Sequence, residues 1–211
     1  MNSDHQYWDF SSVACHARAL LEGNLYFHYF IAPENDELEE GRARITLMQL
    51  NDCCSRMKIF ETVPEQRQWF ENQAEQLRDR LRSIRFFQQL STSTQNSCLS
   101  GKKAWFFDRQ QLVEAVGWEK ADFDVLWDLW SQHSHIHPVS FLRMEPNARG
   151  SGLECDPDRL YIAKAMLISA SIVDGATDKI VEVFPDGADQ RRGVDSEFSP
   201  GPASNAPVHL T

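Results

Sequence analysis

The spacing of apolar residues most constrains what this chain can fold into, because they recur every three or four positions along most of its length. This is the period of an α-helix that buries one face. No pair of segments alternates apolar and polar residues as neighbouring strands do, and no internal repeat occurs. The pattern therefore predicts an all-α protein. Its clearest example is the series Phe70, Ala74, Leu77, Leu81 and Ile84.

Prolines divide the first half of the chain into helices. Residues 13–31 are apolar around much of the predicted helix toward its end, which indicates a central helix, and Pro33 ends it. A second helix is predicted over residues 36–60, with acidic residues in its first turn, as the helix dipole favours. A third begins at Pro64. Residues 91–104 are polar and rich in turn-forming residues, so they predict a loop.

A short helix and a longer one are predicted next. Asp108 is the expected N-cap of the short helix, with Gln111 as its capping-box partner, and Gly117 is expected at its C-terminal end. The longer helix is predicted over residues 120–136 and is limited by Pro138. Both helices carry enough apolar residues to pack on a common core.

The last helix is predicted to open at Asp156-Pro157-Asp158, as a cap followed by proline. Its expected apolar stripe is Ile162, Met166, Ser169, Val173, Ala176, Ile180 and Val183. From Pro185 the composition changes to Pro, Gly, Ser and Asp, which predicts a disordered tail over residues 185–211. The expected architecture is a bundle of five to six helices in one domain, residues 1–184.

Charge and cysteine content narrow the classes of function. The chain has 211 residues, 42% of them hydrophobic, and a net charge of −10, which opposes nucleic-acid binding by bulk electrostatics. Asp122, Asp124 and Asp128 exclude a DNA-reading helix in residues 108–136. Five cysteines without a CxxC spacing predict neither disulfides nor zinc. Without a signal peptide or an apolar run of membrane length, we expect a cytoplasmic protein with no membrane partner.

Three histidines alternate in the segment that ends the predicted 120–136 helix. His133 and His137 would share a helix face at i and i+4, a spacing that suits a metal ion. A third or fourth ligand is missing, however, and Pro138 disfavours helical geometry at His137. Hydrogen bonding at a helix end is the plainer interpretation, with His135 between them. We therefore predict no metal and no cofactor.

Two groups of charged residues are further candidates. Arg18 and Glu22, four apart in an apolar helix, indicate either a buried polar network or an ordinary pair at the edge of the apolar face. Arg78, Arg82 and Arg85 recur at helical spacing, and like charges so placed repel each other. RNA is one ligand that would offset this repulsion; a solvated face is the alternative.

Two motifs resemble a family. ARALLEGNLYFHYFI, residues 17–31, and LWDLWSQHSHIHPVSFLRM, residues 126–144, are similar to segments of a bacterial all-helical family of unknown function related to HEPN-like domains. Some HEPN domains are RNA-cutting toxins or phage-defence proteins, and others are scaffolds. The resemblance implies that Arg18 and Glu22 match the first motif, and His137 or His135 the second. HEPN nucleases carry an Arg five to seven residues before a His, whereas here Arg143 follows the histidines.

These observations predict a non-enzymatic interaction or regulatory protein, with a protein partner or a second copy, in stress or phage defence. One alternative is a metal-independent RNase. It would use Arg18 or Arg143 to stabilise phosphate charge, with Glu22 beside Arg18, and His133 or His137 as general acid or base. A second alternative is a metal-binding protein that uses the three histidines.

Overall fold

The computed structural model describes residues 9–31, 37–135, 137–142, 149 and 153–190. Every regular element in these residues is a helix, which confirms the predicted all-α fold. The predicted tail lies outside the described residues from position 191 onward. The elements are α1 (Phe10–Ile31), α2 (Glu37–Ile59), α3 (Pro64–Ser83), α4 (Arg85–Gln89), α5 (Thr92–Leu99), α6 (Arg109–Ala115), α7 (Lys120–Ser134), α8 (Pro138–Phe141), α9 (Asp156–Val183) and the 3-10 helix η2 (Pro185–Gln190).

The chain forms two compact units. The first, here called the terminal unit, contains the described residues before position 25 and after position 123, and the second, the central unit, contains the described residues of 25–123. The single domain over residues 1–184 stays a prediction, because two compact units can belong to one domain.

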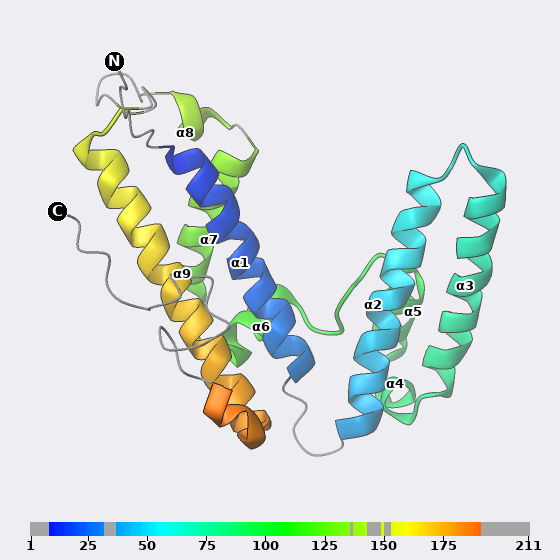
Figure 1. The fold of residues 1–211 in the computed structure, drawn as a ribbon. Coiled ribbons are helices and arrows are strands. Elements are labelled where there is room, and N and C mark those ends of the chain that lie inside the picture. The colour runs from blue at the N-terminus through cyan, green and yellow to red at the C-terminus, as the bar shows by residue number, and fades with distance from the viewer. Residues whose placement is uncertain (1–8, 32–36, 136, 143–148, 150–152, 191–211) are drawn as a thin grey trace. The chain divides into compact units, whose positions relative to one another are not determined.

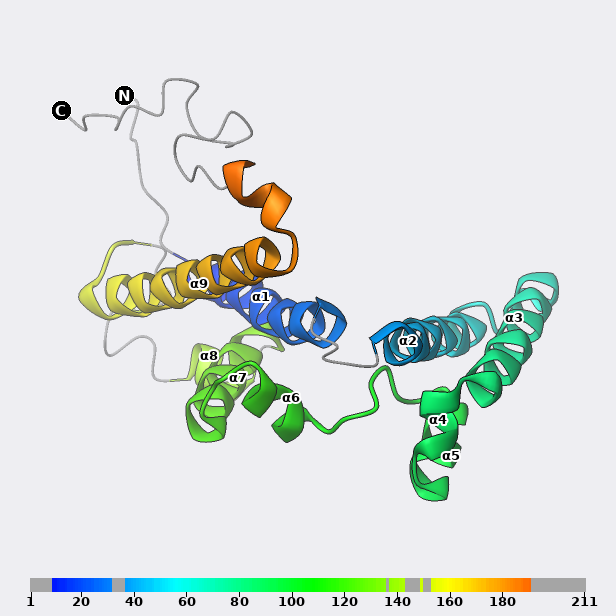
Figure 2. The same cartoon turned by 90° about the horizontal axis from the view of Figure 1, so that it is seen from below.

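In the terminal unit, α1 packs against both α7 and α9. Helices α1 and α9 run side by side in both views (Figures 1 and 2). Aromatic contacts connect the three helices: the ring of Phe10 in α1 lies 4.6 Å from that of His133 in α7 and 5.1 Å from that of Tyr161 in α9. The core residues that the three helices bury are Phe10, Ala14, Ala17, Leu21, Trp130, Ile162, Ala165 and Ile172. Burial of these apolar side chains holds the unit together.

Helix α9 buries a different stripe from the predicted one. Its buried residues are Asp158, Ile162, Ala165 and Ile172, whereas Met166 is 63% exposed and Val173 is 52% exposed. The predicted stripe was wrong at these two positions, and also at the exposed Ile180 and Val183, because α9 carries apolar residues on two neighbouring faces and spacing alone does not say which face is buried. The N-cap also differs, since it is Cys155 and makes no side-chain capping bond.

Among the described residues, α9 is also the one helix that is long and apolar enough to cross a membrane, judged by length and composition alone. Lys164 and Asp174 limit its uncharged run to residues 165–173. A membrane span needs about 20 predominantly apolar residues. The expectation of no membrane partner therefore stays a prediction.

The central unit is built on a hairpin of α2 and α3, which run antiparallel beside each other, with α4 and α5 against them (Figures 1 and 2). The helix starting at Pro64 was predicted correctly, with proline in its first turn. Of its predicted stripe, Ala74, Leu81 and Ile84 are buried. They pack with residues of α2 that are likewise buried, namely Ala43, Leu47 and Leu50.

Residues 92–99, predicted to lie in a loop, form helix α5. The side chain of Ser91 caps this helix by accepting a hydrogen bond from the Thr94 backbone N–H, at 3.2 Å. Cys98 is its fully buried residue. The loop prediction was wrong because a polar, Ser- and Thr-rich sequence also suits a short helix that a serine caps and that buries few side chains.

The capping box of α6 was predicted correctly. The Asp108 side chain accepts a hydrogen bond from the Gln111 backbone N–H, and the Gln111 side chain accepts one from the Asp108 backbone N–H, both at 2.9 Å. Gly117 has a φ of 80°, the left-handed conformation that favours glycine after a helix. Local sequence therefore determines both ends of this helix.

Candidate functional site

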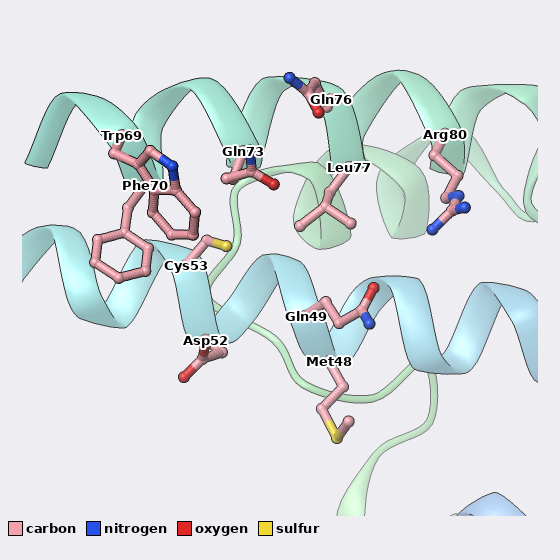
Figure 3. A pocket seen from close by; sticks show the side chains of 10 residues that line it. All are labelled: Met48, Gln49, Asp52, Cys53, Trp69, Phe70, Gln73, Gln76, Leu77 and Arg80. Carbon is pink, nitrogen blue, oxygen red and sulfur yellow. The ribbon is translucent and has the colours of Figure 1, made fainter. Parts of the chain in front are cut away.

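A groove runs between α2 and α3 of the central unit, with a cavity volume of about 800 Å³. Figure 3 shows Trp69 and Phe70 near one end of the groove and Arg80 at the other, with Cys53 and Leu77 pointing into the space between the helices. The α3 residues that line it recur at spacings of four and three, so they form one helix face. These α3 residues are Trp69, Phe70, Gln73, Gln76, Leu77 and Arg80.

The aromatic end of the groove is exposed but well supported. Trp69 is 57% exposed, and its ring meets that of Phe70 edge to face at 4.8 Å. Phe70 in turn stacks on Phe60, with ring centroids 5.7 Å apart, and the Arg56 guanidinium lies 5.6 Å above the Phe70 ring. A large apolar surface held in place by its neighbours is suited to burial against another molecule.

Away from the aromatic end, polar side chains line the groove beside the apolar Met48, Cys53 and Leu77. Gln49 and Gln73 line its middle, where amide groups can donate and accept hydrogen bonds. Asp52 is already paired with Arg56, at 2.8 Å. Arg80 makes no ion pair within the described part of the chain. The groove thus offers an apolar end and a cationic end.

The Cys53 thiol in the groove is 8% exposed. Burial raises its pKa, and the neighbouring charge of Asp52 adds to the rise. A thiol with a raised pKa stays protonated near neutral pH, and the thiolate is the reactive form. The thiol therefore contributes apolar surface to the groove rather than a nucleophile.

The terminal unit holds the residues that sequence analysis singled out as catalytic. The Arg18 guanidinium lies 3.0 Å over the Trp127 ring, its Nε donates to Ser131 Oγ at 3.0 Å, and its Nη1 pairs with Glu22 at 3.1 Å. Arg18 therefore connects α1 to α7, while Glu22 binds it from within α1 and its side chain is 44% exposed. Both interpretations of the pair stay predictions.

His133 lies on the same α1–α7 interface, nearer the start of α1, and is 3% exposed. Its Nδ1 is 3.0 Å from Ser11 Oγ, and its Nε2 is buried without a hydrogen-bond partner in the described residues. Burial lowers the pKa of the ring, as does the nearby charge of Arg149, while Asp158 and Asp9 act in the opposite direction. The imidazole is therefore neutral at neutral pH.

The ion pair beside His133 was not predicted. Arg149 Nε donates to Asp158 Oδ1 at 2.9 Å, and Asp158 is 2% exposed. The Arg149 guanidinium also lies 4.7 Å over the Tyr161 ring. An isolated Asp at the start of a helix is usually a cap, so spacing offered no signal for this pair. Arg149, Asp158 and His133 together form a polar cluster at one end of the terminal unit.

The other predicted catalytic residues do not join this cluster in the described residues. His137 is the exposed N-cap of α8, and its ring lies 5.9 Å from that of His135. Because α7 ends at Ser134, His133 and His137 do not share a helix face. Arg143 lies outside the described residues. No group of three or more potential metal ligands occurs in the part of the chain that the structure describes.

The three arginines of the predicted RNA-binding surface differ in their surroundings. Arg78 donates to the Leu99 backbone oxygen at 2.9 Å, which joins α3 to α5. Arg82 pairs with Asp79 at 2.8 Å and is largely exposed, and Arg85 is exposed beside them. An open cationic surface would therefore consist of Arg82 and Arg85, and RNA binding stays a prediction.

A second buried cation, Arg44, was also missed. Its Nη2 pairs with Glu40 at 2.6 Å, its Nη1 donates to the Tyr29 backbone oxygen, and its guanidinium lies 4.6 Å over the Tyr29 ring. Burial raises the pKa of Tyr29. The i, i+4 spacing of Glu40 and Arg44 was a usable signal, the same one that marked Arg18 and Glu22.

The comparisons with known proteins add no relative. No family model, curated protein or solved structure matches the chain. The resemblance to HEPN-like domains therefore stays an expectation from two short motifs.

Proposed function

We propose that this chain is a non-enzymatic interaction protein that binds an amphipathic helix of a partner protein in the α2–α3 groove. The observation that carries the proposal is the exposed Trp69, supported by Phe70, at the end of a groove of about 800 Å³. Trp and Arg are the residue types that most often dominate binding energy at protein interfaces, and this groove has one of each, Trp69 and Arg80.

The shape of the groove favours a helix over a compact ligand. Its α3 lining extends from Trp69 to Arg80, a length of about 16 Å at the rise of an α-helix. An amphipathic helix binds such a groove through apolar residues at i, i+3 or i+4, and i+7. We expect these anchors on Trp69 and Phe70, glutamine contacts in the middle, and an acidic residue of the partner at Arg80.

The surroundings of the ionisable residues support a structural role for them. Arg18 is engaged by an indole ring, a hydroxyl and a carboxylate, and His133 is buried on the same interface. A general acid or base must reach its substrate, directly or through one water. Contacts of this kind instead hold α1, α7 and α9 together.

A photo-crosslinking amino acid at Gln73 tests the proposal, with the same group at Glu71 as matched control. Gln73 lines the groove and Glu71 lies on an exposed position of the same helix. In lysate of the native cells, we expect the Gln73 probe to crosslink one protein through a single amphipathic helix, identified by peptide mapping, and the Glu71 probe not to. Adding Trp69→Ala should weaken capture about tenfold or more, as expected for an aromatic anchor.

Equal crosslinking from Gln73 and Glu71 would overturn the proposal. So would a Trp69→Ala or Arg80→Glu variant that folds, by circular dichroism, and still crosslinks as the parent does. Both side chains are exposed, so substitution should leave the core intact.

A further inference from the structure

Helix α9 carries a second apolar seam beside the one that it buries. Ala163, Met166, Ala170, Val173, Thr177, Ile180 and Phe184 recur at spacings of three and four, with Phe184 as the C-cap. Met166, Val173, Ile180 and Phe184 are each more than two-fifths exposed, and Ala163 and Ala170 are exposed as well. This outer seam is about 32 Å long at the rise of an α-helix. An exposed apolar stripe of that extent marks an interaction surface.

We infer that the outer seam of α9 binds the outer seam of a second copy of this chain, with the two helices antiparallel. The heptad spacing of the seam is that of a coiled coil, in which each apolar side chain packs between residues of the facing helix. This inference concerns the terminal unit and does not depend on the α2–α3 groove.

The sizes of the side chains favour the antiparallel direction. Small residues, Ala163, Ala170 and Thr177, alternate with the larger Met166, Val173 and Ile180. In an antiparallel pair centred near Ser171, each small residue meets a larger one: Ala163 meets Ile180, Met166 meets Thr177, and Ala170 meets Val173. A parallel pair would place small against small and large against large. Alternation of large and small side chains across a seam fills space best.

The helix dipoles favour the same direction, because antiparallel packing opposes them favourably. The net charge of −10 argues against an anionic membrane surface as the partner that covers this seam.

Sedimentation equilibrium of the full chain tests the interface. We expect a reversible dimer of the 24.3 kDa chain. Val173→Glu should raise the dimer dissociation constant by about tenfold or more, since it places a charge in an apolar contact. Ser171→Glu, which adds the same charge at an exposed position beside the seam, should change it much less. Circular dichroism checks that both variants stay helical.

The direction of the pair has its own test. When chains carrying Ala170→Cys are mixed with chains carrying Val173→Cys, mild oxidation should join Cys at position 170 of one chain to Cys at position 173 of the other, because these positions face each other in the antiparallel pair; peptide mapping identifies the joined positions. A parallel pair would instead join each new cysteine to the same position of an identical chain. A monomer at all concentrations, a dimer that Val173→Glu leaves unchanged, or sedimentation with anionic vesicles in place of self-association would overturn the inference. None of these outcomes bears on the α2–α3 groove.

Discussion

At the scale of single residues, ionisable side chains of the terminal unit occupy positions on the packed faces of helices. Asp158 and His133 are both almost fully buried, and Arg149 connects them to the aromatic residues Phe10 and Tyr161. A buried charge is costly unless it is paired, and removing one partner costs more than the pair contributes. The cluster therefore makes the packing of this unit sensitive to protonation.

The buried His133 predicts a pH dependence of stability. Because burial lowers its pKa below the usual 6.5 in the folded protein, the unfolded chain binds a proton first as pH falls. The free energy of unfolding should therefore be greatest above pH 6.5 and decrease below it, by no more than about 1.4 kcal/mol per pH unit from this residue. Urea unfolding at pH 7.5 and 5.5 measures the change.

The His133→Gln variant should lose part of that decrease, whereas His135→Gln, at an exposed position, should keep it. A decrease of the same size in His133→Gln and in the parent would show that His133 does not cause the dependence.

At the scale of elements, local signals and packing signals have different predictive value. The capping box of α6 and the proline at the start of α3 act within one turn of helix, so the sequence shows them directly. The inward face of α9 was assigned wrongly because the sequence carries two apolar seams there, and only contact with α1 distinguishes them. Helix α5 was missed because a short, polar helix depends on its cap and on one buried cysteine.

The capping box offers a stability prediction at this scale. Asp108→Ala removes the side-chain acceptor of the Gln111 N–H and should lower the free energy of unfolding by about 1 kcal/mol. Urea denaturation measures it. Gln110→Ala, in the same helix, is the control and should cost only a few tenths, since it removes an exposed contact with Glu114. Equal costs for the two variants would contradict the role of the cap.

At the scale of the whole molecule, charge bears on partners. The net charge of −10 opposes condensation on a phosphate backbone, and Arg78 is partly used within the fold. We expect the chain not to retain single-stranded RNA in a filter-binding assay at physiological salt, and Arg82→Gln with Arg85→Gln to change nothing. Retention by the parent that falls in this double variant would instead support the RNA-binding prediction.

The sequence by itself determined the helical class, most helix boundaries and the pairing of Arg18 with Glu22, because periodicity, caps, prolines and i, i+4 spacing act over a few residues. Tertiary structure decided which seam of α9 is buried, that Asp158 pairs with Arg149, and that α2 and α3 enclose a groove ending at Trp69 and Arg80. These features join residues that are distant in the chain or depend on which face a neighbour covers. Packing between helices sets them, and local spacing does not.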